Sequence, residues 1–207
     1  MALVVGFVLA GCSTDTHKSE QKPKEAIAVT PDQDAKTVLT KALDTLKAGN
    51  LAGFAGYLAD YDDNDIHELS IEAQASWLKV DNETAENYLK ALYQELEFSV
   101  LSVKYGDETA TAELEITAVD VAELTDSVQT SFQKEVDRNY QHFANMSEQE
   151  LRLWGIARTI ELLPAAKKIT TTVPIELVVN RSGGVPVWKI LDSESFHHAI
   201  MPGFKEP

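Results

Sequence analysis

Residues 98–118 read FSVLSVKYGDETATAELEITA, and this stretch decides the fold. On both sides of Gly106-Asp107, apolar and polar residues alternate with the period of two that is typical of a half-buried strand. Gly106-Asp107 is typical of a tight turn, so we expect the two strands to pair as an antiparallel hairpin. The alternation is strict over 109–118. Over 98–105 two inward faces remain open, either Phe98, Val100, Ser102 and Lys104 or Ser99, Leu101, Val103 and Tyr105.

Helices are predicted before this hairpin. Thr30-Pro31-Asp32-Gln33 has the pattern of a capping box and predicts where the ordered chain begins. Gly49 fits the left-handed position after a first helix, and Asn50 is expected to cap a short second one. A third helix is predicted over about 83–97. Apolar residues at helical spacing predict the buried faces, which contain Ala35, Val38, Leu39, Ala42, Leu43, Leu46, Leu51, Phe54, Ala55, Leu58, Tyr88, Leu89, Leu92, Tyr93 and Leu96.

A long helical segment is predicted after the hairpin. The period returns to three or four over 121–168, which indicates two amphipathic helices. Ser147 and Glu150 form a second capping box, and Pro164 marks the end of the later helix. Strands return over 169–179 and 185–191, where Trp188 is expected to be a core residue. We therefore predict one α+β domain over 30–207, with N-terminal helices packed on a curved antiparallel sheet and a helical insertion between two strand pairs.

The N-terminus carries a second kind of signal. An uncharged apolar run ends in Leu9-Ala10-Gly11-Cys12, the pattern of a bacterial lipoprotein signal, and Cys12 is the only cysteine of the 207 residues. We expect residues 1–11 to be the signal segment, Cys12 to carry a thioether-linked diacylglycerol, and 12–29 to be a polar tether spanning on the order of 20–25 Å. The first basic residue is Lys18, so we expect the natural start to lie upstream. The alternative is a buried N-terminal strand with an ordinary core cysteine.

The charge balance excludes some partners. The net charge is −15, with 33 acidic and 18 basic residues and no basic run. Nucleic-acid binding needs clustered lysine and arginine, so we expect no nucleic-acid partner. Attachment to a bilayer is expected to depend on the acyl group of Cys12, because the domain would be repelled by anionic lipid.

Two stretches resemble a known group of folds. The hairpin segment 103–112 and the closing strand Gly183-Gly184-Val185-Pro186-Val187-Trp188-Lys189-Ile190 are similar to those of cystatin-like, nuclear transport factor 2-like domains in small lipoproteins of Gram-positive bacteria. The resemblance covers roughly residues 35 to 195 in outline, and the segment 121–168 is larger than the family pattern. It implies a cone-shaped sheet and a location on the outer face of the cytoplasmic membrane. It implies no particular chemistry, because such scaffolds serve as enzymes, binders and dimerisation modules.

Three groups of side chains are candidate sites. Asp60, Asp62 and Asn64 have the spacing of calcium ligands, but Asp65 and Ile71 occupy the places where such a loop needs Gly and Glu, so a solvated loop is favoured. His197-His198 lies near Asp192 and Glu194, but adjacent side chains point apart, which favours a surface role over a metal site. The aromatic residues that line either a pocket or the core are Trp77, Tyr88, Tyr93, Trp154 and Trp188.

Two functional hypotheses follow. The first is a membrane-anchored, non-catalytic domain that uses no cofactor and binds a peptide, an envelope protein or a small apolar ligand, or forms a homodimer through its sheet face. The second is a small isomerase-like or dehydratase-like enzyme with His197 or His198 and an aspartate as its acid-base pair. A buried ionisable pair in a pocket would favour the second hypothesis.

Overall fold

The computed structural model describes residues 34–59, 61–62, 66–67 and 69–203. The helices before the sheet are α1 (Ala35–Lys47), α2 (Leu51–Ala55), α4 (Ile71–Leu78) and α5 (Asn82–Gln94). Four strands follow, namely β1 (Glu97–Tyr105), β2 (Thr109–Val119), β3 (Lys168–Asn180) and β4 (Val187–Ile190). Between β2 and β3 lie α6 (Val121–Arg138), α7 (Tyr140–Asn145), α8 (Glu148–Leu162) and the 3-10 turn Leu163–Ala165, and α9 (Glu194–Ile200) follows β4.

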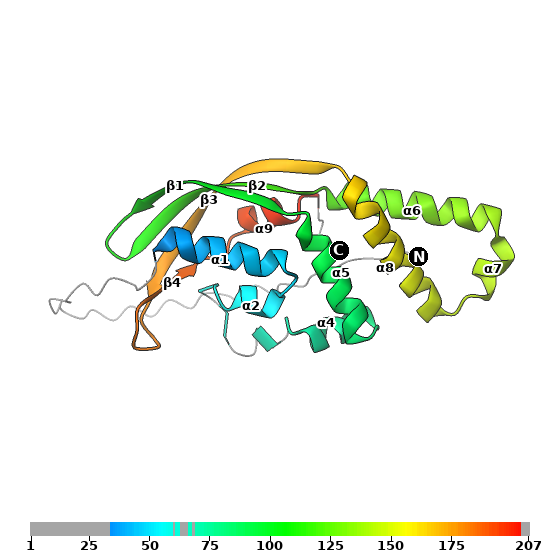
Figure 1. Cartoon of the computed structure of the whole chain (residues 1–207), viewed down its shortest axis with the longest axis horizontal. Helices are drawn as coiled ribbons and strands as arrows, with labels where there is room; N and C mark the ends of the chain where they lie inside the picture. The colour runs from blue at the N-terminus through cyan, green and yellow to red at the C-terminus, as the bar shows by residue number, and fades with distance from the viewer. Residues whose placement is uncertain (1–33, 60, 63–65, 68, 204–207) are drawn as a thin grey trace.

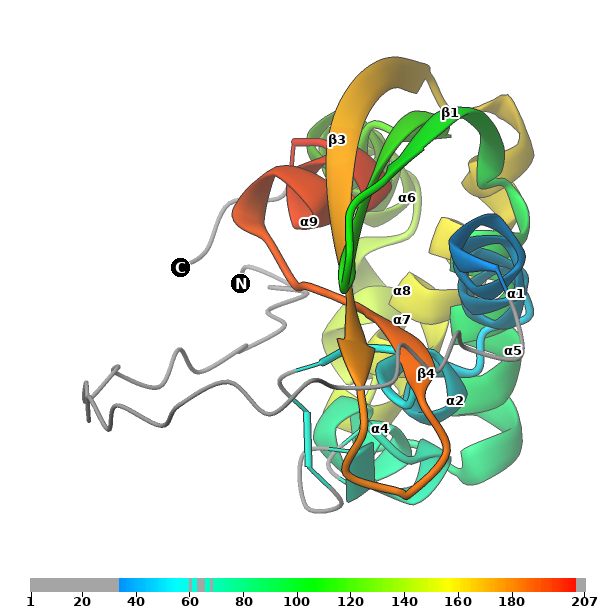
Figure 2. The ribbon, with the colours of Figure 1, turned by 90° about the vertical axis from the view of Figure 1, so that its left-hand side faces the viewer.

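The four strands form one antiparallel sheet in the order β1-β2-β3-β4. In Figure 1 the long strands arch over α1 and α9, and Figure 2 shows the same arch from its end. Alternate residues of β2 are buried and the others are exposed, so one face of the sheet carries the core while the Thr and Glu face meets solvent. The expected α+β class, with a helical insertion between the strand pairs, is confirmed.

A β-bulge in β1 explains why its inward face could not be chosen from the sequence. The register between β1 and β2 shifts between Val100 and Ser102. Before the shift Phe98 and Val100 are the half-buried residues, and after it Val103 is. The extra residue Leu101 exchanges the two faces, so each alternative holds for one half of the strand.

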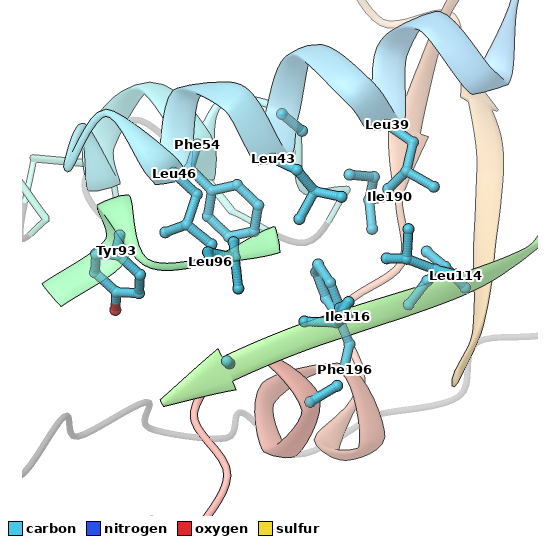
Figure 3. Packing of buried hydrophobic residues seen from close by; sticks show 14 of the residues in the cluster. Leu39, Leu43, Leu46, Phe54, Tyr93, Leu96, Leu114, Ile116, Ile190 and Phe196 are labelled. Carbon is cyan, nitrogen blue, oxygen red and sulfur yellow. The ribbon is translucent and has the colours of Figure 1, made fainter. Parts of the chain in front are cut away.

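The core lies between α1 and the inner face of the sheet. Figure 3 shows Leu39, Leu43 and Leu46 of α1 facing the sheet residues Leu114 and Ile116. On α9, Phe196 is fully buried, reaches Ile116, and has its ring centroid 6.1 Å from that of Phe54 on α2. The core therefore joins helices from both ends of the sequence through β2.

The helix ends follow local sequence signals, with one correction. Asp34 caps α1 by accepting a hydrogen bond of 2.9 Å from the backbone N–H of Thr37, so the described helix uses a cap four residues after Thr30. Residues 30–33 lie outside the described part of the chain. Gly49 has the predicted left-handed backbone, with φ of 78°, and Asn50 caps α2 as predicted. The capping box of Ser147 and Glu150 is also confirmed at α8.

Two helices were not predicted. α4 and α9 have eight and seven residues, too few for apolar periodicity to stand out. Each begins after a serine cap, Ser70 and Ser193, and these serines are the sequence signals that mark them.

Candidate functional site

The helices α6, α7 and α8 form an arm that extends beyond the sheet (Figure 1). The arm leaves the sheet at Asp120, after β2, and returns at Lys167, before β3. Its α6 has 18 residues, which corresponds to a length of about 27 Å. Figure 1 places the start of α1 and the α7 turn at opposite ends of the longest dimension of the molecule. The arm therefore reaches away from the point where the described chain begins.

Polar contacts fix the base of the arm. The side chain of Asp120 caps α6 and accepts a hydrogen bond of 3.0 Å from Lys167 Nζ, and the backbone N–H of Asp120 donates to the carbonyl of Lys167 at 2.8 Å. The bond from the Lys167 side chain, with that from the Glu123 N–H, lowers the pKa of Asp120, and the Asp120 carboxylate raises the pKa of Lys167. The carbonyl of Pro202 also accepts from the N–H of Val121 at 2.9 Å, which ties the chain after α9 to the same base.

The proximal half of the arm is held by a contact between its two long helices. Arg158 Nε on α8 donates to Ser131 Oγ on α6 at 2.6 Å, and Arg158 also pairs with Glu161. Ser131 is buried, and Gly155, Ile156 and Thr159 bury the facing side of α8. This half of the arm is therefore a closed helix pair.

The distal half of the arm is open. From 132 to 154, all of which the structure describes, no residue is buried. The rings of Phe132, Phe143 and Trp154 stack edge to face with centroids 5.4–5.7 Å apart, yet each remains partly accessible to solvent. The three rings come from α6, α7 and α8, one from each helix, and these helices do not fully bury any of them.

Two exposed side chains lie close to this cluster in the sequence. Tyr140 is 70% exposed and Leu153 is 37% exposed, although both are large and carry apolar surface. The same half of the arm has an open depression of about 270 Å³, lined by Gln141, His142, Asn145, Met146 and Glu150. Hydrogen bonds from the backbone and side chain of Ser147 lower the pKa of Glu150, with a smaller contribution from the charge of His142. The distal half of the arm therefore exposes aromatic, aliphatic and acidic side chains to solvent.

A second candidate site joins one of the predicted histidines to an aspartate. His197 Nε2 on α9 lies 2.6 Å from Asp192 Oδ1, and Tyr61 OH lies 3.5 Å from the other carboxylate oxygen. His198 is exposed, as expected for a residue whose neighbour points inward. The pair therefore has the residues of an acid-base site.

The predicted aromatic residues are separated by the fold. Tyr88, Tyr93 and Trp188 belong to the core, and burial raises the pKa of both tyrosines, that of Tyr88 to about 12. Tyr93 OH lies 3.5 Å from Met201 Sδ, beside a cavity of only about 10 Å³. Trp154 belongs to the arm cluster instead.

Trp77, predicted to line either a pocket or the core, is not a core residue, because 45% of it is exposed.

The remaining predicted sites are only partly described. Cys12, with Leu9, Ala10 and Gly11, lies outside the described residues, as do Asp60 and Asn64. Asp62 is described and is exposed. Among the described residues no three His, Cys, Asp or Glu side chains are grouped so that they could hold a metal ion. None of the described helices has the length and apolar character needed to cross a bilayer.

Comparison with known proteins identifies a shared fold. No model of a known family matches the chain, and no curated protein matches it. The crystal structure of a "putative lipoprotein (ycdA)" from Bacillus subtilis matches 82% of this chain with a TM-score of 0.53 and 15% sequence identity. The chain covers 56% of that protein, so it spans little more than half the length of its structural relative.

Proposed function

We propose that this chain is a bacterial lipoprotein whose domain, anchored through acylated Cys12 on the outer face of the cytoplasmic membrane, binds another envelope protein without catalysis. The anchor is supported by the Leu9-Ala10-Gly11-Cys12 pattern and by the likeness to the Bacillus subtilis protein. A cystatin-like, nuclear transport factor 2-like fold of the domain is also part of this proposal.

The open distal half of the arm is the observation that carries the binding role. Three aromatic rings without full cover, next to the exposed Tyr140 and Leu153, form the kind of surface that a helix of a partner protein can complete. A partner helix laid along the arm would form a three-helix unit with α6 and α8 and remove these rings from water. A protein or peptide partner is favoured over a small ligand, because the distal half of the arm is an open surface and not an enclosed cavity.

Photo-cross-linking in intact cells tests the binding role. A photoreactive phenylalanine analogue at Tyr140 is expected to give a discrete adduct, and Leu153→Asp in the same chain is expected to abolish it. The matched control carries the analogue at Thr172, on the exposed outer face of the sheet. Equal adducts from both positions, or an adduct that survives Leu153→Asp, would contradict binding by the arm. An adduct of twice the chain mass from Thr172 alone would instead support a homodimer through the sheet face.

The anchor has its own test. With the natural N-terminal region present, the parent chain is expected to incorporate an acyl label and to fractionate with membranes, and the Cys12→Ala variant is expected to be released or left unprocessed. Equal membrane retention of both chains without any acyl label would overturn the anchor and leave the arm test unaffected.

A second function is favoured by one contact, the 2.6 Å approach of His197 Nε2 to Asp192 Oδ1. A histidine positioned by a carboxylate can act as a general base, which is the chemistry of a small isomerase or dehydratase. Complementation with His197→Ala plus His198→Ala, compared at equal protein abundance, distinguishes the two functions. Loss of the biological role although the variant is still folded at equal abundance would place acid-base catalysis first.

A further inference from the structure

One end of the inner sheet face carries aromatic surface that the helices do not cover. Tyr105 pairs with Ala110, whose side chain is buried, so Tyr105 lies on the face that carries the core. It is nevertheless 55% exposed, and its ring stands edge-on to that of Trp188 on β4, with centroids 6.1 Å apart. We call these two residues, with Val103 on β1, the Tyr105 end.

α1 begins at this end. It lies against both β1 and β4, and Figure 3 shows Leu39 beside Ile190, which occupies the same row of the sheet as Tyr105. Ala35 lies one helical turn before Leu39, at the start of α1. The described chain therefore begins next to the Tyr105 end.

The segment between Cys12 and Asp34 contains one apolar run. Between residue 13 and Asp34, the only apolar residues are Ala26-Ile27-Ala28-Val29, and all the others are polar, charged or proline. Val29 lies five positions before Asp34, a reach of at most about 16–18 Å. The run combines β-branched residues with short ones, a composition suited to packing in extended form on a sheet end.

We propose that Ala26–Val29 is the occupant of the Tyr105 end, with Ile27 and Val29 packed on the exposed ring of Tyr105. The contact removes apolar surface of the Tyr105 ring and of Ala26–Val29 from water, and this burial stabilises the docked state. Docking shortens the free part of the tether from about 25 Å to about 20 Å and fixes the side from which it leaves the domain. This last consequence rests on the proposed anchor, whereas the docking itself does not.

Disulfide trapping in the full chain tests the docking. Cys12→Ser removes the competing thiol, and Ile27→Cys is combined either with Tyr105→Cys or with Lys104→Cys, whose side chain belongs to the opposite face of the same strand. In oxidised glutathione the Ile27–Tyr105 pair is expected to close within one molecule at least about tenfold faster than the Ile27–Lys104 pair. A further control, Lys22→Cys with Tyr105→Cys, places the thiol in the polar part of the tether and is expected to close slowly.

The other outcomes contradict the proposal. Equal rates for Tyr105→Cys and Lys104→Cys would show that the segment does not select this face. Disulfides that form between two molecules would assign the Tyr105 end to a second copy. Because Tyr105 and Lys104 are both exposed, neither substitution is expected to prevent folding. Amide hydrogen exchange of β1 in the Ile27→Asp variant gives an independent reading, with faster exchange at Val103 expected and no change contradicting the docking.

Discussion

Lys167 Nζ lies 3.0 Å from Asp120 Oδ2, and this ion pair closes the base of the helical arm where β2 leaves the sheet and β3 returns to it. Asp120 has only 11% of its side chain exposed and also caps α6, whereas the Lys167 side chain is 58% exposed. The carboxylate therefore contributes to both the arm and the sheet, and loss of its charge is expected to affect them together.

The first prediction concerns acid stability. Because contacts in the folded state lower the pKa of Asp120, the folded state binds fewer protons than the unfolded state near that pKa. The contribution of Asp120 to the free energy of unfolding is complete at pH values above its unfolded pKa of about 3.9. It is lost as the pH falls through the lower pKa of the folded state. The free energy of unfolding of Asp120→Asn should therefore depend less steeply on pH in this acidic range. The control Asp126→Asn on exposed α6 surface should keep the parent slope, and equal slopes in all three chains would contradict the prediction.

The second prediction concerns Trp188. It is 7% exposed and lies beside the fully buried Ile190 on the inner face of β4, as the sequence predicted. Trp188→Ala should lower the free energy of unfolding by about 3–5 kcal/mol. Val185→Ala, at an exposed position just before β4, should change it by less than about 0.5 kcal/mol. An unchanged melting temperature for Trp188→Ala would show that the residue serves recognition instead of packing.

The hairpin was predictable and the distribution of the aromatic residues was not. In β2 each residue is either on the core face or on the solvent face, so its alternation specifies its own burial. The bulge at Leu101 left both faces of β1 equally plausible until the pairing with β2 was known. Trp77 and Trp154 follow helical spacing as well as Tyr88 does, but periodicity does not say whether a helix has neighbours on its apolar side.

The candidate sites depended even more on tertiary structure. Asp192 and His197 are five residues apart, and their contact requires α9 to begin at Ser193 between them. The sequence suggested the pairing of an aspartate with one of the two histidines, but only the helix start selects His197. The distal half of the arm is open because few elements pack around α6 and α8. No sequence pattern within the arm indicates how many neighbours these helices have.

The third prediction concerns Gly49, between α1 and α2. Its φ of 78° belongs to the left-handed region, and a Cβ there would lie 2.7 Å from the backbone nitrogen of Lys90 on α5. Gly49→Ala should cost more than about 1–2 kcal/mol, since the left-handed strain adds to a contact that backbone atoms cannot relieve. Gly183→Ala is the matched control, because an added Cβ there meets nothing within 4 Å. Equal denaturation midpoints for both variants would contradict this reading of the α1–α5 approach.

The last prediction separates the two adjacent histidines. His197 contacts Asp192 and is half-buried, whereas His198 is exposed. His197→Ala should therefore lower the free energy of unfolding by about 0.5–1.5 kcal/mol through loss of one partly exposed polar contact. His198→Ala should change it by less than about 0.5 kcal/mol. Denaturant unfolding of the single variants and of Asp192→Asn provides the measurement, and a double-mutant cycle of His197→Ala with Asp192→Asn isolates the coupling. If the effects of His197→Ala and Asp192→Asn simply add, the 2.6 Å contact contributes no stability. A role in chemistry would then be the remaining reason for the pair.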